Sequence, residues 1–409
     1  MILILSFSSL LLSVVLLQLG SGALGPFDVI SGLALGFSDR QLGLLGSAHF
    51  IGFITGCWWG PRLIGSVGHS RAFACFAAIG TIGILLHMMI VDPWVWALLR
   101  TLSGLSIAGC FTVIEAWMQA KVSNQNRGRA LGIYRTVDLA AGGLAQLLIT
   151  FLMPAHFIAY NILAIICCAS LLPLIVTRLP PPVTPQHLRL QPLLALKISP
   201  MATSGVLVAG VTAAGFRMVG PLYGDRIGLD ISEVAIFLAF YTLGGGLAQY
   251  PAGWLADKID RRQVLIILSF ASLLTCVMTM FAPLDRIWII YLCSTLFGFA
   301  SFPIYSVAAA HANDHSTIEK MVELSASLLF YFSIGAILSP FLLALLIDRF
   351  GPASMFFGIG LVYLTLAGIG GIRMIIGREK HHITPYVYTP RTSYFIGRLL
   401  RFKRRPRDD

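Results

Sequence analysis

The sequence has little charge. Only 11% of its 409 residues are Asp, Glu, Lys or Arg, whereas 57% are hydrophobic, and the mean hydropathy is +0.82. A soluble domain needs a polar surface that this composition cannot supply. The composition therefore excludes a water-soluble globular protein and indicates a chain whose main solvent is lipid.

Catalytic and nucleotide-binding motifs are absent as well. The sequence has no H-E-x-x-H, no histidine–carboxylate metal spacing within an apolar stretch, and no Walker-type G-x-x-x-x-G-K-[ST]. All seven cysteines fall within apolar stretches, where they serve as small hydrophobes and not as a disulfide or metal framework. We therefore expect no enzyme activity, no metal and no cofactor, and an energy source other than ATP.

Long apolar stretches dominate what is present. A helix needs about 20 apolar residues to cross roughly 30 Å of hydrocarbon. The first stretch could be confused with a signal peptide, because Gly20–Ala23 are small, but no Lys or Arg precedes it. The prediction is an all-α membrane protein with twelve spans, at residues 3–25, 41–61, 72–91, 94–118, 130–153, 157–176, 198–222, 232–253, 263–283, 287–311, 321–344 and 352–376.

Basic residues are concentrated in alternate loops. Most lysines and arginines fall in the loops after even-numbered spans and in the tail, which places both termini on the cytoplasmic side. The net charge of +11 therefore reflects membrane topology and not nucleic-acid binding. The tail from Tyr394 to Arg407 alternates apolar and basic residues, as in segments that lie on anionic lipid; a partner site or a topology anchor is equally compatible.

The chain divides into two related halves. The prolines between Pro180 and Pro185 predict a stiff linker. Sliding the second half onto the first places Gly244 on Gly52 and, with one more residue of shift, Gly335 on Gly142. We predict an N-terminal six-helix bundle, a cytoplasmic linker, a C-terminal six-helix bundle and a basic cytoplasmic tail, at residues 1–176, 177–197, 198–376 and 377–409.

The loop after the eighth span reads GWLADKIDRR, from Gly253 to Arg262, and closely resembles the signature loop of the major facilitator superfamily. Gly253 permits close helix packing, Asp257 can cap or pair at a helix end, and Arg261 and Arg262 are expected to face the inner leaflet. Asp260 replaces the glycine of the pattern, so this turn should adopt positive φ less freely.

The corresponding loop of the first half, residues 61–71, departs from the pattern. Gly65 stands where the family has an acid that takes part in a charge relay between the halves, so this relay is in doubt for the first half.

Other segments extend the resemblance. Arg100-x-x-x-Gly104 is similar to the family's fourth-helix motif, whose arginine is linked to proton coupling. The segments at 113–119, 126–135 and 218–223 look most like a bacterial YcaD-like branch, which implies two pseudo-symmetric six-helix bundles, a monomer and a location in the bacterial inner membrane. The fifth span has Gly142 and Gly143 without the proline of the antiporter motif, which makes drug/proton antiport less expected.

Ionisable residues within spans are the first candidates for function, because they are costly in hydrocarbon. Arg100 and Arg217 could contact an anionic substrate or a coupling carboxylate, and Arg100 could instead form a structural pair with Asp28. Asp138 could carry a proton or simply pair with Arg135, three residues earlier on the same helix face.

Further candidates have equally ordinary alternatives. His49 could titrate near neutral pH or serve as a packing residue. Glu115 could form an inner-gate salt bridge to Arg129 or Arg135, a structural pair, or a proton-transfer site.

The tenth span contains Tyr305 among several aromatics around a proline, which suits a cavity wall, a core position or a lipid-facing position. Helix close packing is expected at Gly52, Gly56, Gly104, Gly109, Gly142, Gly244, Gly245 and Gly246.

These observations predict a secondary active transporter of a small solute, coupled to protons and working by alternating access. Efflux of an amphipathic compound and uptake of an organic anion both fit, and the two arginines favour the anion. A non-transporting receptor or scaffold on the same fold is the alternative.

Overall fold

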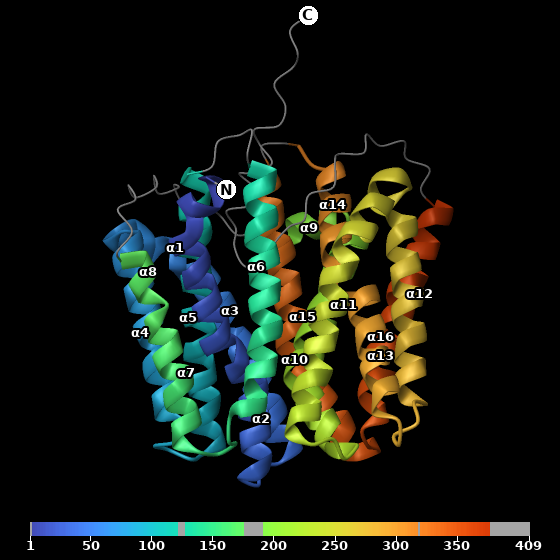
Figure 1. Cartoon of the computed structure of the whole chain (residues 1–409). Coiled ribbons are helices and arrows are strands. Elements are labelled where there is room, and N and C mark those ends of the chain that lie inside the picture. The colour runs from blue at the N-terminus through green and yellow to red at the C-terminus, as the bar shows by residue number, and fades with distance from the viewer. Residues whose placement is uncertain (1, 122–126, 176–190, 318–319, 377–409) are drawn as a thin grey trace, which may run out of the picture.

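The computed structural model describes residues 2–121, 127–175, 191–317 and 320–376, and their side chains apart from residues 2–7, 119–121, 127–131, 322, 375 and 376. Nearly all of this part of the chain is helical, and the helices stand roughly parallel in one bundle (Figure 1). The first half holds α1 (Ile2–Leu17), η1 (Gln18–Gly22), α2 (Ala23–Ala34), α3 (Asp39–Val67), α4 (His69–Leu86), α5 (Pro93–Lys121), α6 (Arg127–Leu148), η2 (Ile149–Phe151), α7 (Phe157–Ala169) and α8 (Leu171–Ile175). The second half holds α9 (Leu193–Ile198), α10 (Pro200–Arg226), α11 (Ile231–Lys258), α12 (Arg261–Met280), α13 (Ile287–Ser301), α14 (Pro303–Asp314), α15 (Met321–Phe350) and α16 (Ala353–Ile376).

In the described part of the chain, twelve spans cross the bundle, as the sequence predicted, and each is either one helix or several short helices in line. Within the described residues, 11 of them are long and apolar enough to cross a membrane by composition alone. The twelfth is α6, which runs the length of the bundle beside α11 but carries charged and amide side chains (Figure 1). Several of these side chains line a central pocket, so the least apolar span is the one that faces a polar interior.

The first span is interrupted near its middle. A π-helical turn, η1, separates α1 from α2, and Pro26 lies in the first turns of α2. Proline has no backbone N–H, so the carbonyl of Gly22, four residues earlier, loses its helical donor. That carbonyl is therefore able to accept a hydrogen bond from outside its own helix.

Corresponding helices of the two halves begin in the same way. Ser38 caps α3 and Asp230 caps α11, and each forms a reciprocal capping box with the residue three positions on, Gln41 or Glu233. Each box satisfies backbone N–H groups that the first helical turn leaves without partners. These matched caps fix the same boundary for the second helix of each half.

Glycines make the same helix crossing in each half. A Cβ at Gly52 would overlap the carbonyl of Thr101, and a Cβ at Gly244 would overlap the carbonyl of Thr295. The partner helices reciprocate through Gly104 and Gly298, so the α3–α5 crossing of the first half and the α11–α13 crossing of the second half have the same form.

Two of the predicted close-packing glycines behave differently. A Cβ added at Gly142 or Gly246 would have no described atom within 4 Å, so the expectation of close packing was wrong there. Gly142 instead lines the central pocket, where a small residue leaves space.

The halves meet along matched seams. The second-half helix α15 packs on α3, and α11 packs on α6, so the second and fifth spans of one half each contact the fifth and second spans of the other. We call the end where α1 begins and α16 ends the near end, and the opposite end, where α2 ends and α3 begins, the far end (Figure 1).

Two ion pairs join the halves at the far end. Arg226 contacts Asp39 at 2.5 Å, and Arg40 contacts Asp348 at 2.9 Å. Both of the inter-half ion pairs that we describe lie at this end. The far end is therefore closed in this structure.

The segment predicted as a linker is partly helical. Its proline run lies outside the described residues, but α9 follows it and docks on α15. The hydroxyl of Ser327 accepts from the backbone N–H of Ala195 at 3.0 Å and donates to the carbonyl of Pro192 at 2.7 Å. The end of the linker is thus attached to the second half.

Candidate functional site

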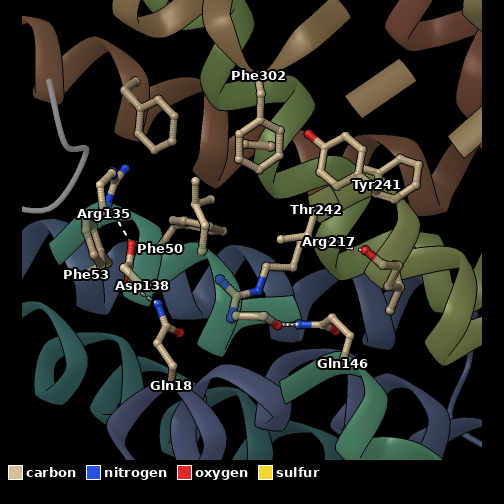
Figure 2. A pocket seen from close by; sticks show the side chains of 16 residues that line it. Gln18, Phe50, Phe53, Arg135, Asp138, Gln146, Arg217, Tyr241, Thr242 and Phe302 are labelled. Carbon is tan, nitrogen blue, oxygen red and sulfur yellow. Dashed lines mark hydrogen bonds and ion pairs between the residues drawn. The ribbon is translucent and has the colours of Figure 1, made fainter. Parts of the chain in front are cut away.

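A pocket lies between the two halves and is lined by both (Figure 2). Its empty volume is about 1050 Å³, including its open mouth. The lining comes from the first, second and fifth spans of one half, and from α10, α11, α15 and the turn between α13 and α14 of the other. It comprises Gln18, Phe50, Phe53, Arg135, Asp138, Leu139, Gly142, Gln146, Ala213, Phe216, Arg217, Leu238, Tyr241, Thr242, Phe302 and Phe332. A site shared by two bundles can be opened and closed by moving one against the other.

One wall of the pocket carries a compensated charge pair. The Arg135 guanidinium contacts the Asp138 carboxylate at 2.7 Å, and Gln18 donates to the other carboxylate oxygen at 2.6 Å (Figure 2). The local i,i+3 pair that the sequence suggested is therefore formed, and it faces the pocket. The pair adds no net charge to this wall.

Arg217, on α10 of the second half, lies on the opposite side of the halves' interface. Its Nη2 donates to the carbonyl of Gly22 at 2.7 Å, which is the carbonyl that Pro26 deprives of its helical donor. Its Nε is buried and has no hydrogen-bond partner among the described residues. Within the same part of the chain Arg217 forms no ion pair, so no carboxylate there is in direct contact with its guanidinium.

Aromatic rings form a large part of the remaining lining. Phe50 and Phe53 come from α3, and Phe216, Tyr241, Phe302 and Phe332 come from the second half (Figure 2). Phe216 and Tyr241 stack at a centroid distance of 4.0 Å, and Tyr241 meets Phe302 edge-on at 5.1 Å. These contacts give the pocket rigid apolar faces that can pack against a ring.

A second polar cluster is buried within the first half. Asp28 on α2 accepts a hydrogen bond from Tyr160 at 2.9 Å, and its other oxygen lies 3.5 Å from Arg100 and 3.4 Å from His87. The side chains of these charged partners are at most 1% exposed. We call Asp28, His87, Arg100 and Tyr160 the buried cluster.

The geometry around His87 leaves a place for one proton. Its Nδ1 lies 2.7 Å from the carbonyl of Gly83, which can only accept, so Nδ1 carries a hydrogen. Its Nε2 faces Asp28 Oδ2, and neither atom has a hydrogen-bond partner among the residues that the structure describes. Two lone pairs facing each other repel, whereas a single proton between them would give an N–H···O contact.

The buried cluster contacts the second half directly. Arg100 Nη2 lies 3.9 Å from the Met218 sulfur on α10, and a Cβ at Gly25 would meet both of these side chains. Met218 also packs against Gly46 of α3, on the far-end side of the interface. Met218 therefore contacts both the buried cluster and a helix of the interface between the halves.

The signature loop of the second half is held by buried ionic contacts. Arg261 is 2% exposed; its Nη1 binds both oxygens of Asp314, at 2.7 and 2.8 Å, and the carbonyl of Ala310. Its Nη2 lies 3.6 Å from Asp257. The expectation that Arg261 faces the lipid headgroups was wrong, because its guanidinium ties the α11–α12 loop to the end of α14.

Asp260 explains how the loop does without the pattern's glycine. It has φ of −57°, and its carboxylate caps α12 by accepting from the Arg262 backbone N–H at 2.8 Å. Burial alone would raise the pKa of Asp260, but hydrogen bonds from the Arg262 side chain and backbone hold it below its usual value. The corresponding loop of the first half uses Gly68 at φ of +85°.

Comparison with known proteins decides the family. The Major Facilitator Superfamily sequence profile matches residues 10–316 and 202–385, which together cover most of the chain. This chain belongs to the Major Facilitator Superfamily.

Relatives with similar sequences include proteins named as uncharacterised transporters of the same superfamily. An uncharacterised MFS-type transporter of Enterobacter sp. (strain 638) is 25% identical over 354 residues, covering 85% of this chain and 89% of that protein. The uncharacterised MFS-type transporter YcaD of Escherichia coli O6:K15:H31 is 25% identical over 336 residues, covering 80% and 86%. The resemblance to the YcaD-like branch is thereby confirmed.

Solved superfamily structures share the fold. The nucleoside transporter NupG superposes with a TM-score of 0.73 at 13% identity, covering 93% of this chain and all 100% of NupG. A bacterial homologue of the human lysosomal transporter Spinster, inward-facing and occupied, gives 0.74 at 15% identity, covering 91% and 96%. The chain is a multi-pass membrane transporter of a bacterial superfamily branch, not an enzyme.

Within this superfamily fold, the predicted site residues fall into separate groups. Arg135, Asp138 and Arg217 line the pocket, while Arg100 lies in the buried cluster and pairs with Asp28. His49 does not line the pocket; its Nδ1 lies 3.3 Å from the Ser103 hydroxyl, as expected of a packing histidine.

Two further predicted residues lie behind the pocket. Tyr305 is 3% exposed and packs edge-on against Phe332, while Phe302, three residues earlier, reaches the pocket. Glu115 is buried and accepts from the Tyr134 hydroxyl at 3.2 Å. The Arg129 side chain and the basic tail lie outside the described residues, and the Arg135 ion pair that we describe is with Asp138.

Sequence reasoning missed His87 and Tyr160 as partners of Asp28. His87 lies near the end of the predicted span 72–91, directly after α4, and Tyr160 is one of many aromatics in apolar spans. Their one available signal was an acid in the first span, Asp28, which needs polar partners wherever it is buried.

Proposed function

We propose that this chain is a secondary active transporter that moves a small solute by alternating access and is driven by protons. The observation that carries the proposal is the pocket itself, which both halves line and which two inter-half ion pairs close off at the far end. Exchange of these far-end contacts for near-end contacts would expose the same pocket to the other side of the membrane.

The buried cluster is the proposed proton site. Asp28 is faced by Tyr160 from α7, His87 from the end of α4 and Arg100 from α5, and a proton between Asp28 and His87 would leave the cluster with a net positive charge. Added charge in a dry interior is costly, so uptake would favour an arrangement that admits water or an anion. Because Arg100 contacts Met218 of the second half, the free-energy cost of the added charge would weaken the packing between the halves.

The near end is proposed to face the cytoplasm of a bacterial inner membrane, with both termini inside. Basic loops and the basic tail lie on this side of the predicted topology, as the positive-inside rule requires. The structure would then be inward-facing. We further propose that the protein works as a monomer and that the tail contacts anionic lipid of the inner leaflet.

Reconstituted flux tests the proposal. The purified protein in liposomes would be given aromatic carboxylates, their neutral amides, cationic amines and, because NupG carries nucleosides, nucleosides, with and without an imposed proton gradient. We expect accumulation of at least one class that depends on the gradient and collapses when a protonophore is added. Equal flux with and without the gradient would remove proton coupling while leaving transport intact.

The receptor alternative has its own outcome in this experiment. A solute that binds the purified protein but is never moved by it, in either direction and at any gradient, would contradict the transporter proposal. Detection of binding by a method independent of flux, such as thermal stabilisation, keeps these two outcomes apart.

A further inference from the structure

We infer that the central pocket selects small monoanions with an aromatic body, and that Arg217 binds the anionic group. This inference rests on the proposed function, because it names the substrate class of the same pocket. It starts from the sum of the charges that line the pocket and from the shape of its apolar walls.

The charges leave one positive charge uncompensated. Arg135 and Asp138 neutralise each other at 2.7 Å, and Gln18 satisfies the second carboxylate oxygen. Arg217 is the other charged residue of the lining, and among the described residues its only hydrogen bond is to the neutral carbonyl of Gly22. A guanidinium held in hydrocarbon favours an anionic partner, which the described part of the protein does not supply in this state.

Arg217 is positioned rigidly enough to act as a binding group. The Gly22 carbonyl above Pro26 holds Nη2 at 2.7 Å and leaves Nε as a buried donor without a partner among the described residues. Figure 2 shows its guanidinium among the side chains that line the pocket. An orphaned charged donor beside a cavity marks a place for a carboxylate oxygen.

The other polar groups limit the ligand to one negative charge. Gln146 is 5% exposed, its Nε2 points to the carbonyl of Gly142, and its Oε1 is buried without a partner in the described part of the chain. An acceptor oxygen and the nearby Asp138 carboxylate both oppose a second anionic group. Dianions should therefore bind more weakly than monoanions of the same body.

Aromatic faces define the body of the ligand. Six of the lining residues are Phe or Tyr, contributed by both halves, and several are themselves held by stacking contacts. Pockets of this kind derive affinity from ring burial and orientation from a few polar groups. An aliphatic acid of two or three carbons could contact Arg217 but would not pack against the aromatic side chains of the lining.

Ligand-induced thermal stabilisation of the purified full-length protein tests the inference. The probes are benzoate, phenylacetate and 3-phenylpropanoate, the matched amides, benzylamine, phthalate as a dianion, and acetate. We expect at least one aromatic monocarboxylate to bind roughly tenfold or more tightly than its amide, since a charge-assisted contact contributes about that much. Matching affinities of acid and amide, or no binding by any carboxylate, would overturn the inference.

Variants assign the preference to Arg217. Arg217→Gln should abolish the difference between acid and amide, whereas Arg217→Lys, which keeps the charge, should retain part of it. Arg373→Gln is the matched control, because Arg373 is an exposed residue near the end of α16 and does not line the pocket. An acid preference that persists in Arg217→Gln protein with a normal elution profile would also overturn the inference.

The proposed function and this inference can fail separately. Flux of neutral or cationic solutes that Arg217→Gln leaves unchanged would support transport and overturn the anion site. Tight, Arg217-dependent binding of an aromatic acid that never crosses the membrane would support the anion site and contradict transport.

Discussion

The two halves have the same helix crossings but bury their charges in different places. In the first half Arg100 and Asp28 are buried in the middle of the bundle, and the loop between its second and third spans has Gly65 and His69 where the second half has Asp257 and Arg261. In the second half the position equivalent to Arg100 is Ser294, and the neighbouring core is aromatic. The two halves thus share their helix packing, but the first buries charge among its helices and the second buries charge at its loop.

This difference suggests separate roles for the halves. His69 is buried beside Trp117, with ring centroids 5.8 Å apart, whereas Arg261 is fixed by two carboxylates. The second half therefore has an ionic loop and a stacked aromatic core, which favour a rigid body. The first half has a buried charged cluster and a loop without ion pairs among its described residues, which suits the responsive partner.

The largest effect is expected from Asp28→Asn, which removes the anion of the buried cluster. Arg100 would remain buried without its counterion, so the free energy of unfolding should fall by about 3–5 kcal/mol. Flux should also lose its dependence on the proton gradient. The free energy of unfolding can be measured on protein in bicelles, and the flux on protein in liposomes.

The comparison variant of the second half is Ser294→Ala, at the position equivalent to Arg100, the partner of Asp28. It removes one hydrogen bond, from Ser294 Oγ to the Phe237 carbonyl at 2.7 Å, and should cost only about 1 kcal/mol without altering proton dependence. Equal losses in the two variants would remove the contrast between the cores.

The next largest effect is expected from substitutions at equivalent positions of the two loops, one in each half. Arg261→Gln removes the ion pair to Asp314, whose side chain is 6% exposed, and should destabilise the protein by roughly 3 kcal/mol. His69→Gln, at the equivalent position, should cost about 1 kcal/mol, because it loses ring packing only. Chemical denaturation of both variants in the same detergent compares their free energies of unfolding. A larger loss of stability in His69→Gln than in Arg261→Gln would contradict the expected difference between the loops.

Alanine at the helix crossings tests the symmetry that underlies the comparison. Gly104→Ala and Gly298→Ala each push a Cβ into a carbonyl of the neighbouring helix, so each should cost about 1–3 kcal/mol. Gly246→Ala, where no described atom lies within 4 Å, is the control and should be nearly neutral. Unequal losses at Gly104 and Gly298 would show that the crossings are not equivalent in energy.

The smallest effect is expected at the loop turn. Asp260→Ala removes the cap of α12 and the contact with Arg262, and should cost about 1 kcal/mol. The pKa of Asp260 lies below its usual value, so its contribution is present above the unfolded-state pKa and is lost only in strong acid. The difference between wild type and Asp260→Ala should therefore be constant from about pH 5 to 8, and a loss within that range would contradict the assignment.

Much of the fold could be predicted from the sequence. Helix length, apolar composition and the repeated glycines depend on local chemistry, so the twelve spans and the equivalence of Gly52 and Gly244 were found without coordinates. The signature loop was found as well, but not the burial of Arg261, which depends on Asp314 on a distant helix.

The site was less predictable, because its contacts join distant parts of the chain. Asp28 meets Tyr160 across 132 residues, and Arg217 meets Gly22 across 195. Contacts between residues so far apart in the sequence produce no regular spacing from which they could be predicted. Sequence could name Arg100 and Arg217 as ionisable residues in spans, and it offered a pair of Arg100 with Asp28 as one alternative. It could not show that His87 and Tyr160 join this pair, or that Arg217 faces the pocket without an ion pair among the described residues.

A distance measurement across the far end tests the account most directly. Spin labels at the exposed positions Ala34 and Ser232 would report the separation of the halves there, after replacement of the exposed Cys75 and Cys168. The account predicts a second, longer distance whose population depends on the proton concentration in the wild type and does not depend on it in Asp28→Asn. A single distance that is the same at every pH in both proteins would contradict it.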